Sequence, residues 1–336
     1  IGDLTTVDKS LPVQIGTKTN WVDVSGGVGS SIAIDEDGKT IFSSGNPDHI
    51  TCVRSSLKPF QASASILSGA TITAGFNREE IALMCASHNG EDIHVKTVQS
   101  MLNKLGLSTA DLECGSHFPS DKITRRKMIK DGKNAEQFHN NCSGKHVGML
   151  ALAKHLGQGI KGYIQKDHPV QKEIFNLVNE LTGAENIPTE TDGCSAPTPF
   201  MSLETIARLF QKLAAGETPE LSRVFDAMCS HPHLVGGTNH FDSLFIEALA
   251  GRGITKVGGE SVRGVALKKP NGGSIGIALK ILDGNFRALP LATMKLLEHL
   301  ELLTDAELQK LYKFRTKILK NHNQLKIGRI EAIVET

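Results

Sequence analysis

The sequence predicts an α+β fold whose antiparallel sheet is built from strands at both ends of the chain. Short apolar segments flank a tight turn near the N-terminus, and a second such pair occurs near the C-terminus. The stretch between them has apolar residues mainly at helical spacing. Such a layout does not need the parallel βαβ repeats of a nucleotide-binding fold. We expect one domain over residues 1–336, with 20–60 and 250–336 in the sheet layer and about 61–249 in a mostly helical region.

The N-terminal strands are predicted from SSIAIDEDGKTIFSSG (30–45), where an Asp-Gly pair separates two apolar segments as in a β-hairpin. Helical spacing begins in LKPFQASASILSGA (57–70). Pro59 suits a first helical turn, because no N–H partner is lost there. Asn77 is predicted to cap the next helix, and Gly106 to end the one after it.

The rest of the chain is predicted to hold further helices and a second hairpin. The middle, about 115–245, is mostly helical with glycine-rich interruptions. The segment VRGVALKKPNGGSIGIALKILDG (262–284) has two apolar stretches around an Asn-Gly-Gly turn, which predicts a second hairpin. A final helical region is expected over about 290–320.

Charge and composition exclude several classes of function. The chain has 37 basic and 36 acidic residues, so it has no electrostatic footprint for nucleic acid or an anionic membrane. Aromatic residues make up 5%, which argues against stacking platforms for single strands. No stretch approaches the roughly 18 apolar residues that span a bilayer. The N-terminus has no apolar signal segment and the six cysteines are scattered, so we expect a cytoplasmic protein with reduced thiols.

The segment CVRSSLKPFQA (52–62) places Ser55 three residues before Lys58. On a helix the two side chains lie on one face, where a desolvated lysine can accept the hydroxyl proton. A serine at a helix N-terminus also faces N–H groups that favour developing negative charge. The alternative is a serine N-cap followed by a surface lysine, and the spacing alone does not exclude it.

A second serine and a second lysine stand in other segments. Ser87, in CASHNGE (85–91), is either a hydroxyl that relays a proton or part of a capped joint between helices. Lys256, in ITKVGGES (254–261), lies near the start of the C-terminal strands. Its Lys-x-Gly pattern is similar to the Lys-Thr-Gly of serine β-lactamases and penicillin-binding proteins. The alternative is a strand start with a solvated lysine.

A candidate metal site is split between NNCSGKHVGML and TDGCSAPT. Cys142, Lys145 and Cys194 either meet around a soft metal ion or belong to loops with buried thiols. Lysine is an uncommon ligand because it must first lose a proton. No Cys-x-x-Cys or His-x-x-x-His pair points to this site, so spacing alone does not identify it.

Five segments of the chain occur in the order RSSLKPFQA, CASHNGE, NNCSGKHVGML, TDGC and KVGGES, the last followed by GIALKILDG. In this order they resemble the motifs of the Rhizobium-type L-asparaginases, also called the asparaginase II or class 3 family. The resemblance covers about residues 20–330. It implies a fold similar to serine β-lactamases and penicillin-binding proteins, with a sheet flanked by helices and a helical subdomain. It also implies hydrolysis of the side-chain amide of L-asparagine to L-aspartate and ammonia, and a homodimer.

The resemblance implies two Ser–Lys pairs, Ser55 with Lys58 and Ser87 with Lys256. Family members usually read Ala-Glu-Gly after the second lysine, where this chain has Gly-Glu-Ser at 259–261. The choice of Lys256 over Lys268 or Lys269 therefore depends on the Lys-x-Gly pattern. The first pair would supply nucleophile and base, and the second would pass a proton to the leaving group.

The resemblance also implies binding residues. Arg54 and Asp192 match positions that hold the substrate's charged backbone groups. Cys142, Lys145 and Cys194 match a zinc site near the substrate, so Zn²⁺ is the expected cofactor. Other readings stay open: a related serine amidohydrolase acting on glutamine, β-lactams or peptides, or a non-catalytic amino-acid-binding protein.

Overall fold

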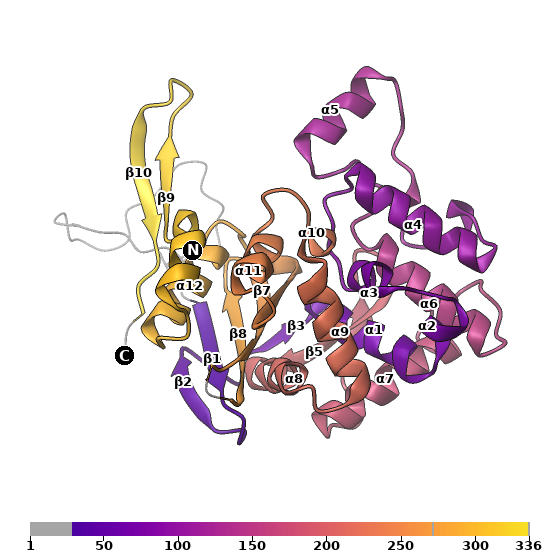
Figure 1. Ribbon diagram of the computed structural model, residues 1–336, viewed down its shortest axis with the longest axis horizontal. Helices are drawn as coiled ribbons and strands as arrows, with labels where there is room; N and C mark the ends of the chain where they lie inside the picture. The colour runs from indigo at the N-terminus through magenta and orange to yellow at the C-terminus, as the bar shows by residue number, and fades with distance from the viewer. Residues whose placement is uncertain (1–28, 271, 335–336) are drawn as a thin grey trace, which may run out of the picture.

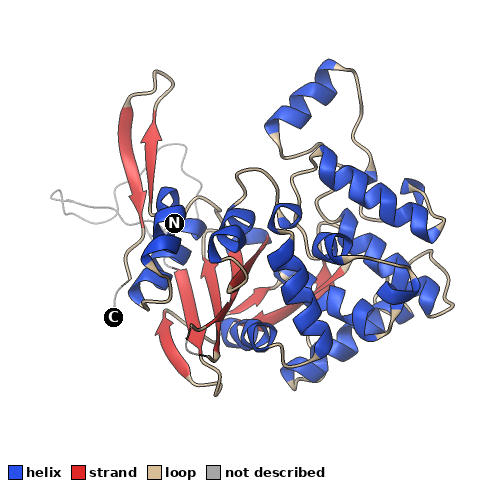
Figure 2. Ribbon diagram, viewed as in Figure 1, coloured by secondary structure: helices blue, strands red, loops and turns tan. Residues whose placement is uncertain are grey.

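The computed structural model describes residues 29–270 and 272–334 (Figure 1). Residues 20–28 of the predicted sheet layer and Asn271 of the predicted turn lie outside the described residues. Strands gather on one side of the molecule and most helices on the other (Figure 2). The apolar core is one continuous cluster that connects the two sides.

The main sheet joins the two ends of the chain, as the sequence predicts. Its strands are β1 (Gly29–Ile34), β2 (Thr40–Ser44), β6 (Gly253–Gly258), β7 (Val262–Lys268) and β8 (Ser274–Ile281). Their spatial order is β2-β1-β8-β7-β6, and every neighbouring pair is antiparallel. Both predicted hairpins, β1–β2 and β7–β8, are present. The predicted α+β class, with an antiparallel sheet from both ends of the chain, is confirmed.

Helices fill the middle of the chain, as expected. They are α1 (Lys58–Leu67), α2 (Ala70–Thr73), α3 (Arg78–Met84), α4 (Asp92–Leu105), α5 (Lys122–Lys130), α6 (Ser143–His155), α7 (Pro169–Thr182), α8 (Leu203–Ala215), α9 (Pro219–Ser230), α10 (Pro232–Val235), α11 (Phe241–Leu249), α12 (Leu289–His299) and α13 (Asp305–Lys310). Asn77 caps α3 through a reciprocal bond pattern with Glu80, and Gly106 ends α4 at a φ of 64°. In the part of the chain that the structure describes, no helix is long and apolar enough to cross a membrane.

Helix α8 packs directly against β7, β8 and β1. Two strand glycines allow this close approach. A Cβ on Gly264 would overlap the Phe210 ring, and a Cβ on Gly276 would overlap the backbone of Ala207 and Gln211. The residues of β8 are buried along its whole length, so helices and loops cover both of its faces.

Gly276→Ala is therefore expected to destabilise the protein by about 1–3 kcal/mol or more, because helix backbone cannot move aside as a side chain can. The change in the urea midpoint of unfolding measures this. Gly159→Ala is the matched control, since a Cβ there meets nothing within 4 Å. Equal stability of Gly276→Ala and the wild type would contradict the packing described here.

A small second sheet, which the sequence did not reveal, leads into the pocket described below. It has the order β3-β5-β4, with strands β3 (Ile50–Cys52), β5 (Pro197–Ser202) and β4 (Thr189–Thr191). The turn between β4 and β5 contains Ser195 at a φ of 71°. The three strands are short and come from distant segments, so no local pattern identifies their pairing.

The expected final helical region, about 290–320, is wrong in its last part. After α13 the chain forms a hairpin of β9 (Thr316–Lys320) and β10 (Lys326–Glu331). The Asn321 side chain accepts a hydrogen bond from the N–H of Leu325 (2.9 Å), and Gln324 has a φ of 63°. This turn reverses the chain after β9, so that β10 runs back along it.

Candidate active site

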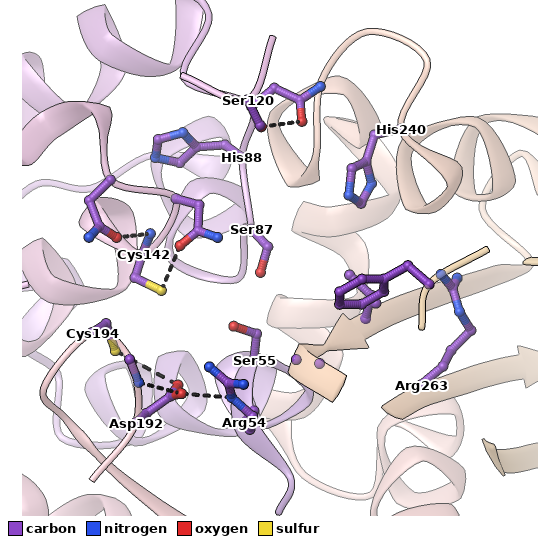
Figure 3. Close-up of a pocket in the computed structure, with 18 of the residues that line it drawn as sticks. Arg54, Ser55, Ser87, His88, Ser120, Cys142, Asp192, Cys194, His240 and Arg263 are labelled. Carbon is purple, nitrogen blue, oxygen red and sulfur yellow. Dashed lines mark hydrogen bonds and ion pairs between the residues drawn. The ribbon is translucent and has the colours of Figure 1, made fainter. Parts of the chain in front are cut away.

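The predicted catalytic segments meet around one pocket of about 570 Å³ (Figure 3). It lies where the turn after β3, the loop after α3, the start of α6 and the end of β6 come together. Ser55 and Ser87 both line it and point toward its centre (Figure 3).

Ser55 lies in a 3₁₀ turn, Arg54–Leu57, that directly precedes α1. The small sheet holds the start of this turn, because Arg54 N donates to Thr198 Oγ1 (2.9 Å). Arg54 has a φ of 51°, a left-handed conformation that is uncommon for a residue with a side chain. No serine side chain caps α1, so the reading of this segment as a serine N-cap is wrong.

Ser56, the neighbour of Ser55, has no place in the pocket. It is fully buried, and its Oγ has no hydrogen-bond partner among the described residues. A Cβ on Gly258 would lie 2.6 Å from this oxygen. Ser56 therefore packs against the end of β6 and leaves Ser55 on the open side of the turn.

Lys58 is fully buried beneath the pocket. Its Nζ donates to Ser87 Oγ (3.1 Å) and to the carbonyl oxygens of Ala86 and Asn141. The spacing predicted a lysine beside Ser55, and in the structure the side-chain partner of this lysine is Ser87, with two carbonyl oxygens as its other acceptors. Lys58 thus connects the segment of the first serine to the second serine.

Lys256 projects from β6 and is also fully buried. Its Nζ donates to Ser87 Oγ (2.8 Å) and to the carbonyl of Val257. Burial lowers the pKa of Lys256 to about 7, an effect that Asp242 opposes and the charge of Lys58 reinforces. Ser87 therefore lies between two buried lysine amines, and Lys256 can be neutral near pH 7.

An ion pair beneath the pocket was missed in the sequence. Asp242, on α11, accepts from Arg263 Nη1 (2.7 Å) on β7 and from the N–H of Val257 (2.9 Å). Asp242 Oδ2 lies 3.9 Å from Lys256 Nζ. All three charged groups are buried. An arginine inside the apolar strand VRGVALK was the signal that could have indicated such a pair, since a buried cation needs a partner.

Arg54 and Asp192 also meet at the pocket. Arg54 Nε donates to Asp192 Oδ1 (2.8 Å), and Arg54 Nη1 lies 3.3 Å from the exposed Glu260 carboxylate. A Cβ on Gly259 would overlap the guanidinium, so this glycine is needed for Arg54 to lie flat on the backbone. Arg54 and Asp192 thus place a cation and an anion at one end of the pocket, below Ser55 in Figure 3.

Cys142, Lys145 and Cys194 come together beside this ion pair. Lys145 Nζ donates to Cys194 Sγ (2.9 Å), and Cys142 Sγ donates to Asn141 Oδ1 (3.0 Å). The neighbouring Cys142 thiol and the ammonium of Lys145 both lower the pKa of the Cys194 thiol. Burial alone would lower the pKa of Lys145, but the charge of Cys194 raises it.

Two sulfur atoms and one lysine nitrogen fit a soft divalent cation such as zinc, once the thiols and the amine lose their protons. The buried Nε2 of His146, on the same helix, has no hydrogen-bond partner among the described residues. Within those residues no group of three or more His, Cys, Asp or Glu side chains could hold a metal, so lysine is needed to complete the set.

The family model of L-asparaginase II matches residues 25–332, which include every segment of the pocket. No curated protein matches the chain. Similar solved structures include a single-residue variant of the TLA-1 extended-spectrum β-lactamase (12% identity, TM-score 0.39, 86% of this chain and 92% of that chain). Others are a β-lactamase from Sphaerobacter thermophilus (13%, 0.39, 85% and 92%) and a class A β-lactamase from Bacteroides cellulosilyticus (12%, 0.38, 86% and 91%).

Proposed function

Because the chain belongs to the L-asparaginase II family, we propose that it hydrolyses the side-chain amide of L-asparagine to L-aspartate and ammonia through a covalent acyl-enzyme. The observation that carries this proposal is the pocket itself. Two serines and two buried lysines converge there, next to a paired arginine and aspartate.

In the first step, Ser55 Oγ attacks the amide carbon and its proton passes to Lys58. An amide nitrogen is a poor leaving group, so covalent catalysis divides the reaction into two easier steps. Lys58 Nζ contacts Ser87 Oγ, and Ser87 Oγ contacts Lys256 Nζ, so a proton can move along this chain to the departing nitrogen. Ammonia then leaves, and an aspartyl ester remains on Ser55.

In the second step, water attacks the ester carbon and the same groups act in reverse. Backbone N–H groups near Ser55 would stabilise the oxyanion in both steps, a contribution of about 3–4 kcal/mol per donor in other hydrolases. Arg54 would bind the substrate carboxylate and Asp192 its ammonium, each exchanging part of its present pairing for the substrate.

The pKa of Lys256 near 7 predicts the basic limb of the pH profile. Lysine supplies a proton to Ser87 only when it is protonated, and its protonated fraction falls as the pH rises above its pKa. We expect kcat/KM for asparagine to fall about tenfold per pH unit above that pKa and to level off below it. Initial rates of ammonia release across pH measure this, and a profile without a basic limb would contradict the role of Lys256 in supplying the proton of the leaving nitrogen.

Cys142, Lys145 and Cys194 would hold a zinc ion at the edge of the pocket, where it would order the substrate and these side chains. We expect purified protein from zinc-supplemented medium to contain the metal and Cys142→Ser to lose it, as elemental analysis measures. Chelation should raise KM more than it lowers kcat. A wild-type protein without metal under these conditions would contradict the site.

The homodimer and the cytoplasmic location stay predictions.

The test of the proposed function is ammonia release from asparagine and glutamine, beside hydrolysis of a chromogenic β-lactam. We expect asparagine to give the highest kcat/KM. Preference for glutamine or the β-lactam would assign the pocket to another amidohydrolase. Labelling of Ser55 without product release would instead indicate a binding protein that has lost turnover.

A further inference from the structure

The pocket is larger than its proposed substrate requires. Its volume of about 570 Å³ lies within the range of about 300–1,000 Å³ that encloses drug-sized ligands, whereas asparagine is a small amino acid. Arg54 and Asp192, which would hold the substrate's backbone groups, occupy only one end (Figure 3). The remaining space is therefore beyond the scissile amide.

The arrangement of the reacting groups fixes the direction in which the leaving nitrogen points. Ser87 and Lys256 would deliver its proton, and they are bonded to each other on the side of β6 and α11. Arg263, which pairs with Asp242, lies on that side, away from Asp192 and Cys194 (Figure 3). A substituent on the leaving nitrogen would thus extend toward α11 and the start of α12.

That end of the pocket has an apolar wall. Its side chains are Phe241, Phe286, Leu289 and Pro290. The Phe241 ring is held from behind, because the Arg263 guanidinium lies 4.2 Å from its centroid and the Phe314 ring meets it edge-on. Phe286 is 52% exposed, so it presents an aromatic ring at the pocket rim.

Two polar side chains facing this wall, Ser120 and Asn89, already have partners. Ser120 Oγ donates to Asn89 Oδ1 (3.1 Å), and Asn89 Nδ2 donates to the carbonyl of Thr238 (3.2 Å). His240 Nδ1 accepts from the N–H of Asp242, and the ring points into the pocket (Figure 3). The far end therefore offers apolar contact to a ligand beside the imidazole of His240.

We propose that this pocket also hydrolyses N4-substituted L-asparagines, the β-aspartyl amides of primary amines that carry an apolar or aromatic group. This inference rests on the proposed function and extends it. Ser55 Oγ forms the ester bond to the β-carbonyl carbon as the carbon–nitrogen bond breaks, and the nitrogen takes a proton from Ser87, which Lys256 restores. The amine leaves in place of ammonia, and water then releases L-aspartate.

The test compares L-asparagine, N4-methyl-L-asparagine and N4-benzyl-L-asparagine with the full chain, with aspartate release measured for all three. We expect the benzyl amide to be hydrolysed with a higher kcat/KM than the methyl amide, because only the benzyl ring reaches the apolar wall. Hydrolysis of asparagine without hydrolysis of the benzyl amide would overturn this inference and leave the proposed function intact. If none of the three compounds is hydrolysed, both the proposed function and this inference are overturned. If only the benzyl amide is hydrolysed, the inference is supported and asparagine is not the substrate.

Phe286→Ala tests the wall itself. We expect kcat/KM for the benzyl amide to fall about tenfold, in line with the loss of an apolar contact in a specificity pocket, with asparagine hydrolysis unchanged. Leu282→Ala is the matched control, since Leu282 is a similarly exposed side chain (47%) on the same loop and does not line the pocket. An equal effect of Phe286→Ala on both substrates, or no effect on either, would overturn the assignment of this wall to the leaving group.

Discussion

Ser55→Ala is expected to lower kcat/KM for asparagine by at least about a thousandfold while the protein stays folded, as loss of a serine nucleophile does in other hydrolases. Ser55 stands on the open side of its turn, and no other serine of that turn reaches the pocket. The substitution removes one partly exposed hydroxyl, so it leaves the buried core unchanged. Ammonia release and the thermal midpoint of the same preparation measure the two effects.

Ser56→Ala is the control for this change. It alters the same type of side chain one position along, but its Oγ is buried without a partner and outside the pocket. Removing such an oxygen should leave activity intact and keep or raise stability. A Ser55→Ala protein that hydrolyses asparagine at the wild-type rate would show that the nucleophile lies elsewhere, with Ser87 as the first candidate.

Lys256→Met is expected to have the second largest effect, a loss of about a hundredfold to ten-thousandfold in kcat, the contribution typical of a positioned acid or base. Lys256 is the residue whose pKa lies near neutrality and whose Nζ contacts Ser87 Oγ. Methionine has a similar length and needs no hydrogen bond. Asp242 keeps its ion pair with Arg263, so no buried charge is left alone.

We therefore expect Lys256→Met to unfold at the same temperature as the wild type or above it, and its pH profile to lack the basic limb. Lys280→Met is the matched control, because Lys280 is a buried lysine on strand β8 of the same sheet and donates to two carbonyls. That control should keep its hydrolysis. Equal losses of activity in both variants would mean that the effect of Lys256→Met reflects general damage to the sheet.

Local signals in the sequence predicted most of the fold. The Asp-Gly turn of β1–β2, the Asn77 cap and the Gly106 helix end depend on neighbouring residues, and all three are present in the structure. The β3-β5-β4 sheet could not be predicted, because its short strands pair only after distant segments come together. The β9–β10 hairpin was missed because apolar residues at 318 and 319 fit a helix as well as a strand.

The site was predictable as a set of residues and less so as a set of contacts. Family motifs identified Ser55, Lys58, Ser87 and Lys256, and these four converge in the structure. Their roles stay predictions. The direct contact of both lysines with Ser87 depends on the tertiary arrangement of α1, the loop after α3, and β6, which spacing along the chain does not specify.

The central claim is a covalent aspartyl-enzyme on Ser55, and peptide mapping by mass spectrometry after rapid quenching within a single turnover of asparagine tests it most directly. We predict an aspartyl group on the peptide that contains Ser55, which disappears as aspartate is released. An aspartyl group on Ser87, or none on any residue while asparagine is being consumed, would contradict the mechanism.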